Sequence, residues 1–293
     1  MKVLVTGASG FVGRHLVPAL NKLGHTVIAV DSKSFKSIDI GPSKEVDYII
    51  HLAVKTAAGG YCQTHPGEQF LINSDINNYM LQVWKNKYPN AKMITFGSSC
   101  SYDKNSIKIE NNYLKGDVEP GYEVYGNIKR NLLIGLQALK KEYDMNYSFL
   151  IPSVFYGPEY DLDDKHFIFD LIRKIVSAKN GGPEVVLWGD GTQTRELIYI
   201  KDAVDIIIQA MEWDLEVVNL SSGVEYSIQK YAETICDIVG YDSSNINYDI
   251  TKFVGSKSKN LVNTFLPEFY FTPMREGLEK TIEYYESRSS SSK

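Results

Sequence analysis

Three glycines near the N-terminus constrain the fold of this chain more than any other feature. Gly7, Gly10 and Gly13 directly follow the apolar segment Lys2–Thr6, and the helical pattern Val12–Leu23 overlaps the last of them. Such a strand–turn–helix is typical of a dinucleotide site, because glycines let a diphosphate approach the open N–H groups of the helix. The alternative is a tight turn with chance glycines, and the position between an apolar strand and an amphipathic helix favours the dinucleotide site.

An acidic residue after the second apolar segment bears on the choice of cofactor. Asp31 ends the segment Thr26–Val30, 18 residues after the last glycine. A carboxylate at this place can accept hydrogen bonds from the adenosine ribose, which favours NAD(H). Two alternatives stay open. Ser32, Lys33 and Lys36 follow closely and could hold the 2′-phosphate of NADP(H), and Asp31 could be a surface residue at the strand end without a role in binding.

Apolar segments alternate with helical patterns through the first half of the chain. Strands this apolar, separated by helices, indicate a parallel sheet covered on both faces. We therefore predict a doubly wound, Rossmann-type α/β fold. The link Ser32–Glu45 is barely long enough for a crossover, so we expect its helix to be short or missing. The remaining elements expected here are strands at Val46–Ala53, Ala91–Gly97 and Tyr147–Ile151, and helices ending at Lys87 and covering Glu123–Tyr143.

The second half mixes strand and helix patterns and predicts a smaller mixed α/β substrate lobe. We expect a dinucleotide-binding domain over 1–155, which receives further elements from about 190–220, and a substrate lobe mainly over 156–287. The Ser-rich segment 288–293 is expected to be disordered. The elements predicted here are helices at His166–Ala178, Asp202–Trp213 and Ser227–Val239, and strands at Val185–Trp188 and Val217–Leu220.

Composition excludes several function classes. The 293 residues are 43% hydrophobic and 23% charged, as in an ordinary globular chain. A net charge of −5 without a basic block argues against nucleic-acid binding, and no apolar run approaches the roughly 18 residues of a membrane span. No signal peptide is evident, so we expect a cytoplasmic protein. The three cysteines lack a CxxC motif, which argues against disulfides and a metal site.

Tyr125 and Lys129 are the strongest catalytic candidates. At i and i+4 on the helical segment Glu123–Tyr143 they share one face, and an ammonium beside a phenol lowers its pKa. The alternative is a surface tyrosine with a solvated lysine. The same Y-x-x-x-K spacing recurs elsewhere, but only this pair lies between the fourth and fifth predicted strands, where its helix can flank a cofactor. The other three pairs are Tyr88/Lys92, Tyr226/Lys230 and Tyr248/Lys252.

Polar residues follow the fourth predicted strand, at the sheet edge where doubly wound folds bind ligands. A hydroxyl of Ser98 could contact a substrate carbonyl, and the thiol of Cys100 could carry a proton or could equally be a small buried residue. His166 opens a helix, where a lone histidine is usually a cap. Arg195 follows a Gly-rich turn and could hold a phosphate or remain solvated.

Taken in order, the motifs resemble the extended short-chain dehydrogenase/reductase family over residues 1–287. They are GASGFVG, HLAVK, GSSCSY, YGNIK and YGPE. The segments FGSSCSY, LWGDGTQTRELIYIKDA and SSGVEYSIQKYAETICDIVGY, together with the run from His166 to Lys174, are most similar to the 3,5-epimerase/4-reductase branch that acts on GDP-4-keto-6-deoxy-mannose. The resemblance implies an NAD(P)-dependent nucleotide-sugar enzyme and a homodimer.

The resemblance also implies a role for each catalytic candidate. Tyr125 would be the general acid for the C4 alkoxide, Lys129 would bind the nicotinamide ribose and tune Tyr125, and Ser98 would assist at the C4 oxygen. Cys100 and His166 would match the pair that removes and returns protons at C3 and C5. A 4-ketone acidifies those protons, so two positioned proton carriers suffice for epimerisation.

The remaining contacts come from the resemblance and from the glycine turn. Among them, Lys55 would lie near the nicotinamide, Lys174 near the diphosphate, and Asp39 and Ile40 at the adenine. The cofactor contacts besides Asp31, Tyr125 and Lys129 are Gly7, Gly10, Phe11, Val12, Gly13, Asp39, Ile40, Leu52, Ala53 and Lys55, and the substrate contacts are Ser99, Lys174, Trp188 and Arg195.

Three departures from the branch keep an alternative open. Val154 stands where relatives usually carry an asparagine that touches the substrate, Asp31 fits NAD although the branch prefers NADPH, and the link Ser32–Glu45 is short. The alternative is an NAD-dependent nucleotide-sugar 4-epimerase or 4-dehydrogenase that retains its cofactor. A third hypothesis is a protein that binds the cofactor but has no catalytic activity, and the presence of Tyr125 and Lys129 argues against it.

Overall fold

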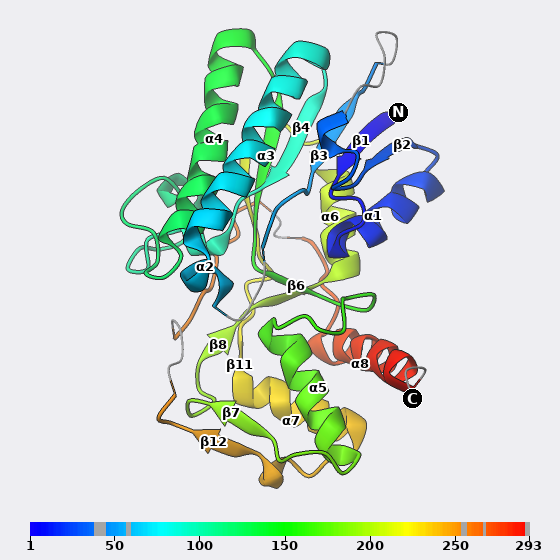
Figure 1. Ribbon diagram of the computed structural model, residues 1–293, viewed down its shortest axis with the longest axis vertical. Helices are drawn as coiled ribbons and strands as arrows, with labels where there is room; N and C mark the ends of the chain where they lie inside the picture. Colours follow the sequence, from blue (N-terminus) through cyan, green and yellow to red (C-terminus); the bar gives the residue numbers. More distant parts are fainter. Residues whose placement is uncertain (38–44, 57–59, 253–256, 266–267, 291–293) are drawn as a thin grey trace.

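A six-stranded parallel sheet forms the upper of two lobes (Figure 1). The computed structural model describes all residues except 38–44, 57–59, 253–256, 266–267 and 291–293. The strand order is β10-β5-β4-β3-β1-β2, so the direction of winding reverses between β1 and β3. Ligands of doubly wound folds bind at the carboxyl edge of such a switch point. The strands are β1 (Lys2–Thr6), β2 (Thr26–Val30), β3 (Tyr48–His51), β4 (Lys92–Phe96), β5 (Tyr147–Pro152) and β10 (Val217–Leu220).

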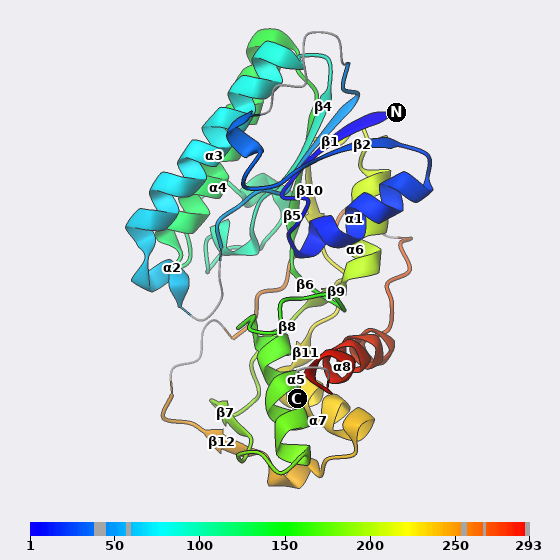
Figure 2. The ribbon, with the colours of Figure 1, turned by 45° about the vertical axis from the view of Figure 1, so that its right-hand side comes forward.

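Helices cover both faces of this sheet, which explains why its strands are apolar throughout. Successive side chains of a strand point to opposite faces. Leu4 belongs to one buried cluster with Trp84 and Leu132, whereas Val3 and Val5 belong to a second one. Figure 2 shows the two layers on either side of the sheet. The flanking helices are α3 (Pro66–Lys87) and α4 (Glu123–Tyr143) on one face, and α1 (Phe11–Lys22) and α6 (Ile200–Gln209) on the other.

The lower lobe packs three helices against short strand pairs (Figures 1 and 2). Its helices are α5 (Phe167–Lys179), α7 (Ile228–Val239) and α8 (Met274–Ser290). The pairs β7/β12 and β6/β9 are parallel, and β8/β11 is antiparallel. These strands are β6 (Val154–Tyr156), β7 (Val186–Trp188), β8 (Thr194–Arg195), β9 (Leu197–Tyr199), β11 (Tyr226–Ser227) and β12 (Asn247–Asp249).

Short helical segments occupy several connections. The described part of the link between β2 and β3 holds only a 3-10 turn, as its length suggested. This 3-10 turn is η1 (Phe35–Ser37). The short helical segments in the other connections are α2 (Tyr61–Thr64), η2 (Ser99–Ser101), η3 (Glu110–Asn112) and η4 (Ser243–Asn245).

The predicted fold class, a doubly wound parallel sheet, is confirmed, whereas the end of the chain differs from the prediction. The segment 288–293 was expected to be disordered, but α8 continues through Ser290, so this expectation is wrong for 288–290. Leu278 and Ile282, one turn apart, anchor the helix in the core, and Arg288 lies over the Tyr284 ring at its end. The residue limits given for the two domains stay a prediction.

Candidate active site

The glycine turn forms a cradle that side chains would fill. Gly7 has φ +68°, and a Cβ there would lie 2.8 Å from the Ala53 nitrogen. A Cβ on Gly13 would lie 2.4 Å from the Gly7 carbonyl oxygen. Gly10 begins α1 without a side-chain cap, so the first N–H groups of the helix can meet a ligand. This bare, positively polarised cradle fits the diphosphate of a dinucleotide.

A buried hydrogen-bond chain fixes the wall opposite the cradle. The Ala53 N–H donates to Thr6 Oγ1 at 3.3 Å, and Thr6 Oγ1 lies 2.7 Å from His51 Nδ1. Burial, with the nearby charge of Lys129, lowers the pKa of His51 to about 3. The ring is therefore neutral: its Nδ1 accepts from the Thr6 hydroxyl, and its Nε2–H faces Asn77 Oδ1 at 3.4 Å.

The proposed adenosine end is organised around Asp31. Its Oδ1 accepts from the Ser34 N–H at 2.9 Å, the Ser34 hydroxyl at 2.8 Å and the Lys33 N–H at 3.0 Å. The bonds from Ser34, and then Lys33, lower the pKa of Asp31, which is ionised at neutral pH. Lys36 forms an ion pair with Asp75 at 2.7 Å.

Two further cofactor predictions have different outcomes. The main chain of Lys55 is held by Asn73, which accepts from the Lys55 N–H at 2.7 Å and donates to its carbonyl at 2.9 Å. The Lys55 side chain is exposed, with Nζ 5.9 Å from the Tyr61 ring centroid. Asp39 and Ile40 lie outside the described residues.

Leu52, Phe11 and Val12 border the cradle in different ways. The backbone of Leu52 approaches Gly7 as closely as that of Ala53 does. The Phe11 ring packs edge-on against Phe169 of α5 at 5.9 Å, and Val12 packs against the same core. The side chains of Phe11 and Val12 therefore pack in the core. Only their main-chain N–H groups, in the open first turn of α1, remain as possible cofactor contacts.

Tyr125 and Lys129 lie in the first turns of α4, with Lys129 Nζ 5.9 Å from the Tyr125 ring centroid. Burial lowers the pKa of Lys129 to about 8. Burial also raises the pKa of Tyr125, and the neighbouring thiol of Cys100 raises it further. The expectation that Lys129 lowers the pKa of this phenol is therefore not met, because desolvation outweighs the ammonium. Tyr125 is a protonated phenol at neutral pH, suited to donate a proton.

The turn after β4 is locked to α4. Ser98 Oγ accepts from the Cys100 N–H at 3.2 Å, and the Ser98 N–H donates to the Tyr113 hydroxyl at 3.2 Å. Arg130 Nε donates to the Ser101 carbonyl at 2.9 Å. Because Arg130 directly follows Lys129, one helix positions both the Tyr–Lys pair and the serine–cysteine turn, and Ser99 lies inside that turn.

An ammonium that the sequence did not reveal lies against Cys100. Lys259 Nζ is 3.6 Å from the Cys100 sulfur, 3.1 Å from Glu119 Oε2 and 4.5 Å from the Tyr122 ring centroid. Lys259 and Cys100 are 159 positions apart and share no motif, so no sequence signal links them.

His166 caps the start of α5 from the other lobe. Its Nδ1 lies 2.6 Å from Asp164 Oδ1, which also accepts from the His166 N–H at 2.7 Å. The side chain is 42% exposed, and within the described part of the chain no contact joins it to Cys100. The structure thus brings Tyr125, Lys129, Ser98 and Cys100 together, and leaves His166 oriented by Asp164 at a distance from them.

Of the predicted substrate contacts other than Ser99, one lies near the catalytic cluster and two lie on the lower lobe. Arg195 lies in β8 close to Cys100 and Glu119, and burial lowers its pKa. Trp188 is 59% exposed at the end of β7, and Lys174 forms an ion pair with Asp170 at 3.0 Å. Arg195 therefore joins the catalytic cluster, whereas the other two lie on the lower lobe.

Val154 begins β6, which pairs with Leu197 of β9. An aliphatic side chain offers no hydrogen bond, so the Val154 side chain can contact a substrate only by packing.

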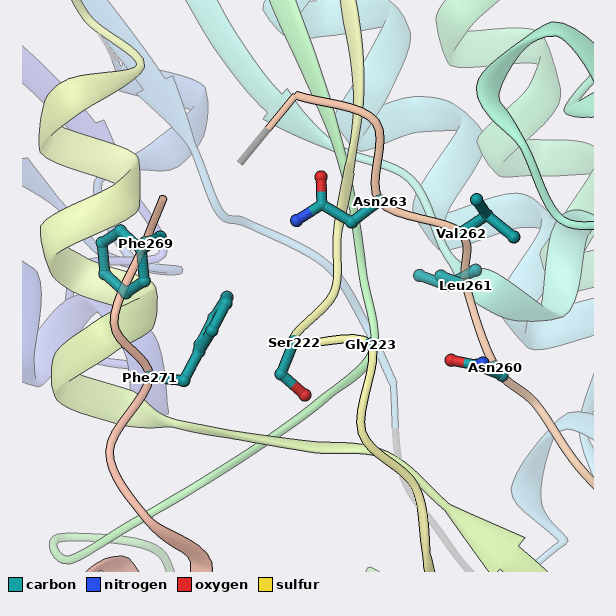
Figure 3. A pocket seen from close by; sticks show the side chains of 8 residues that line it. All are labelled: Ser222, Gly223, Asn260, Leu261, Val262, Asn263, Phe269 and Phe271. Atoms are coloured by element: carbon teal, nitrogen blue, oxygen red, sulfur yellow. The ribbon is translucent and has the colours of Figure 1, made fainter. Parts of the chain in front are cut away.

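A cavity of about 350 Å³ in the described part of the chain is lined by other residues, among them Asn260, which directly follows Lys259. Figure 3 shows Phe269 and Phe271 on one side of it and Leu261 and Val262 on the other. None of the predicted site residues lines it. The remaining lining residues are Ser222, Gly223, Asn260 and Asn263.

Two kinds of feature are absent from the described residues. No helix among them is long and apolar enough to cross a membrane. Over the same residues, no group of three or more histidine, cysteine or acidic side chains is arranged to hold a metal ion.

The buried charge of Lys129 leads to a stability prediction. Its folded pKa of about 8 lies below the ordinary lysine value of 10.5, so folding disfavours the ammonium. Lys129→Met should raise the free energy of unfolding by on the order of 3 kcal/mol below pH 8. The gain should shrink as the pH rises from about 8 toward 10.5. Thermal and urea unfolding of the cofactor-free protein measure it, and a destabilised variant at pH 7 would contradict the assignment.

Comparisons with known proteins agree with this geometry. A family model described as "NAD dependent epimerase/dehydratase family" matches residues 3–221. The chain is 29% identical to GDP-L-colitose synthase of Yersinia pseudotuberculosis, over 97% of this chain and 98% of the relative. It is 28% identical to GDP-L-fucose synthase 1 of Arabidopsis thaliana, over 97% and 93% respectively. The crystal structure of a GDP-L-fucose synthetase from Naegleria fowleri bound to NADP superimposes with a TM-score of 0.85 at 21% identity, covering 99% of this chain and 95% of that one.

Proposed function

Because the chain belongs to the NAD dependent epimerase/dehydratase family, we propose that it is an NAD(P)-dependent enzyme that epimerises a GDP-linked 4-keto-6-deoxy sugar at C3 and C5 and reduces it at C4. The observation that carries the proposal is the placement of a thiol, Cys100, beside Tyr125 and Ser98 in one cluster. A reductase alone needs no second proton carrier. Full-length similarity to a GDP-L-colitose synthase and to GDP-L-fucose synthases supports the GDP-linked substrate.

Reduction at C4 follows from the protonation state of Tyr125. When bound along the glycine cradle, the nicotinamide cofactor supplies the hydride. Tyr125 gives its phenolic proton to the C4 oxygen, and the Ser98 hydroxyl holds that oxygen by a hydrogen bond. The Lys129 ammonium, buried beside the phenol, stabilises the negative charge that develops there.

Epimerisation uses the acidity of the protons beside the ketone. The Cys100 thiolate removes the proton at C3 or C5. The electron pair of the broken C–H bond forms a double bond to C4, and the π pair of the ketone moves onto the C4 oxygen. His166, held by Asp164, returns a proton to the opposite face of the carbon.

A coupled assay tests this function directly. Purified protein with GDP-4-keto-6-deoxy-mannose should consume NADH or NADPH and release a GDP-6-deoxy sugar. Binding of the cofactor without any consumption would contradict the proposal. A retained cofactor that interconverts two GDP-sugars without net consumption would instead support the second candidate, the 4-epimerase, which Asp31 favours.

The ionised carboxylate of Asp31 supports NAD(H) as the preferred cofactor. It can accept from the ribose hydroxyls and repels a 2′-phosphate. NADP(H) has its own support, since the solved Naegleria fowleri relative holds NADP. We expect NADH to bind at least about tenfold more tightly than NADPH, which corresponds to about 1.4 kcal/mol. Asp31→Asn should remove most of this preference. Titration calorimetry measures both constants, and tighter binding of NADPH to the unmodified protein would overturn the assignment.

Exposed apolar side chains on α3 and α4 support a homodimer. Phe70 and Leu71 are 51% and 69% exposed on α3, and Ile134 is 50% exposed on α4. Association through these helices would bury them. A cytoplasmic location is part of the proposal, because the proposed nucleotide-sugar substrate and nicotinamide cofactor are small soluble molecules.

A further inference from the structure

One segment crosses from the lower lobe to the upper lobe and carries an ammonium into the catalytic cluster. We call residues 257–263 the interlobe strap, which is part of the orange trace in Figures 1 and 2. Lys259, in its middle, is the residue whose ammonium approaches the sulfur of Cys100 at 3.6 Å. Its side chain is 16% exposed, so water screens the interaction little.

Hydrogen bonds fix the strap to both lobes. On the lower-lobe side, Glu225 accepts from the Ser258 hydroxyl at 2.7 Å and from the Lys259 N–H at 3.1 Å. On the upper-lobe side, Asn219 Nδ2 donates to the Val262 carbonyl at 3.0 Å. Further bonds join the Thr194 N–H to the Lys257 carbonyl, the Ser221 hydroxyl to the Leu261 carbonyl, the Val262 N–H to the Lys108 carbonyl and Asn263 Nδ2 to the Ser221 carbonyl. The strap therefore presents Lys259 at a defined place rather than as a free surface side chain.

Glu119 and Tyr122 keep the lysine charged. Burial disfavours the ammonium, but Cys100, the Tyr122 phenol and the Glu119 carboxylate raise the pKa of Lys259 above its ordinary value. The Tyr122 ring, 4.5 Å away, adds a cation–π contact. Lys259 is thus a permanent cation at neutral pH and does not itself exchange a proton.

We propose that Lys259 is a positioning residue for the epimerisation, whose fixed ammonium, 3.6 Å from the sulfur, stabilises the thiolate of Cys100 and holds it in place. The inference rests on the proposed function. The reacting base is the thiolate, because only it has the electron pair that takes a proton from carbon. When the C–H bond at C3 or C5 breaks, its proton forms the S–H bond, its electron pair forms a double bond to C4, and the carbonyl π pair moves to the C4 oxygen. Lys259 keeps all its protons throughout.

A purely structural ion pair between Lys259 and Glu119 is the competing explanation. It predicts that removing the lysine charge changes stability and leaves the thiol unchanged. The reactivity of the Cys100 thiol, measured without substrate, distinguishes this explanation from the proposed role of Lys259. The other ionisable groups that lie within electrostatic range of Cys100 are Cys62, Tyr113, Tyr122, Tyr125 and Arg195.

The decisive experiment is the pH dependence of alkylation of Cys100 by iodoacetamide, read by mass spectrometry of the peptide that contains it. Lys259→Met should shift the midpoint upward by about one pH unit and slow alkylation near neutral pH about tenfold. Lys259→Arg should restore most of the rate. Lys257→Met, an exposed charge change on the same strap, is the matched control and should leave the profile in place. Identical profiles for Lys259→Met and the unmodified protein would overturn the inference.

Two further measurements keep the outcome interpretable. If Lys259→Met does not fold, Glu119→Gln provides the test. Without the competing carboxylate the Lys259 ammonium acts on the thiol alone, so alkylation of Cys100 should be faster. Slower alkylation would contradict the inference. Deuterium exchange at C3 and C5, with the 4-keto sugar and oxidised cofactor, should fall about tenfold in Lys259→Met. If the unmodified protein shows no exchange, the proposed function fails; if it exchanges and the alkylation profile is unmoved, only the role of Lys259 fails.

Discussion

Replacing Tyr125 with phenylalanine should lower kcat for reduction of the 4-keto sugar by about 10²- to 10⁴-fold, the range expected for loss of a general acid. The ring that packs in the cluster is kept and only the hydroxyl is lost, so the fold and cofactor binding should persist. Because burial raises the pKa of Tyr125, the phenol is protonated across the neutral range, so its ionisation should not change the rate of reduction there.

The chain provides a matched control for this variant. Tyr226 stands in the same Y-x-x-x-K spacing, with Lys230, but lies in β11 of the lower lobe. Tyr226→Phe should retain activity within a few-fold and Tyr125→Phe should not. Stopped-flow measurement of hydride transfer with saturating cofactor separates the chemical step from binding. Equal rates in the two variants would show that another group protonates C4.

Adding a single methyl group to the glycine turn should abolish cofactor binding. In Gly13→Ala the new Cβ would lie 2.4 Å from the Gly7 oxygen and 2.5 Å from the Ala8 oxygen, both of which are backbone atoms. The turn must open, which costs about 1–3 kcal/mol of stability as overpacking does and removes the close approach of the diphosphate. We expect cofactor affinity to fall at least about 100-fold, equivalent to about 2.8 kcal/mol.

Gly67→Ala is the control for this second variant. Gly67 lies in the first turn of α3, where an added Cβ meets no atom within 4 Å. It should leave both stability and affinity nearly unchanged. Calorimetric titration with the cofactor and thermal unfolding measure the two effects. An unchanged affinity in Gly13→Ala would mean that the dinucleotide binds elsewhere.

The features that could be predicted from the sequence are those with local signals. The glycine spacing, the apolar strands and the i, i+4 placement of Tyr125 and Lys129 each depend on residues close together in the chain. The structure places them as expected, with the strands in one parallel sheet. The serine–cysteine turn after β4 was also placed correctly, because it follows a strand at the sheet's carboxyl edge.

The features that were missed depend on contacts between distant residues. Lys259 reaches Cys100 only because hydrogen bonds from both lobes hold the interlobe strap, and no spacing in the sequence encodes this. The direction of the pKa shift of Tyr125 was wrong because the local argument counted its neighbouring ammonium and not its burial. Helix α8 was missed because its two fully buried aliphatic residues, Leu278 and Ile282, stand in a segment rich in charged and serine residues.

The most direct test of this account is the isotopic composition of the product. The protein, GDP-4-keto-6-deoxy-mannose and reduced cofactor are incubated in heavy water, and the product is analysed by mass spectrometry and NMR. The account predicts deuterium at both C3 and C5, because Cys100 and His166 exchange protons with solvent there, and none at C4, which receives hydride. Reduction at C4 without deuterium at C3 or C5 would contradict it and leave a simple 4-reductase.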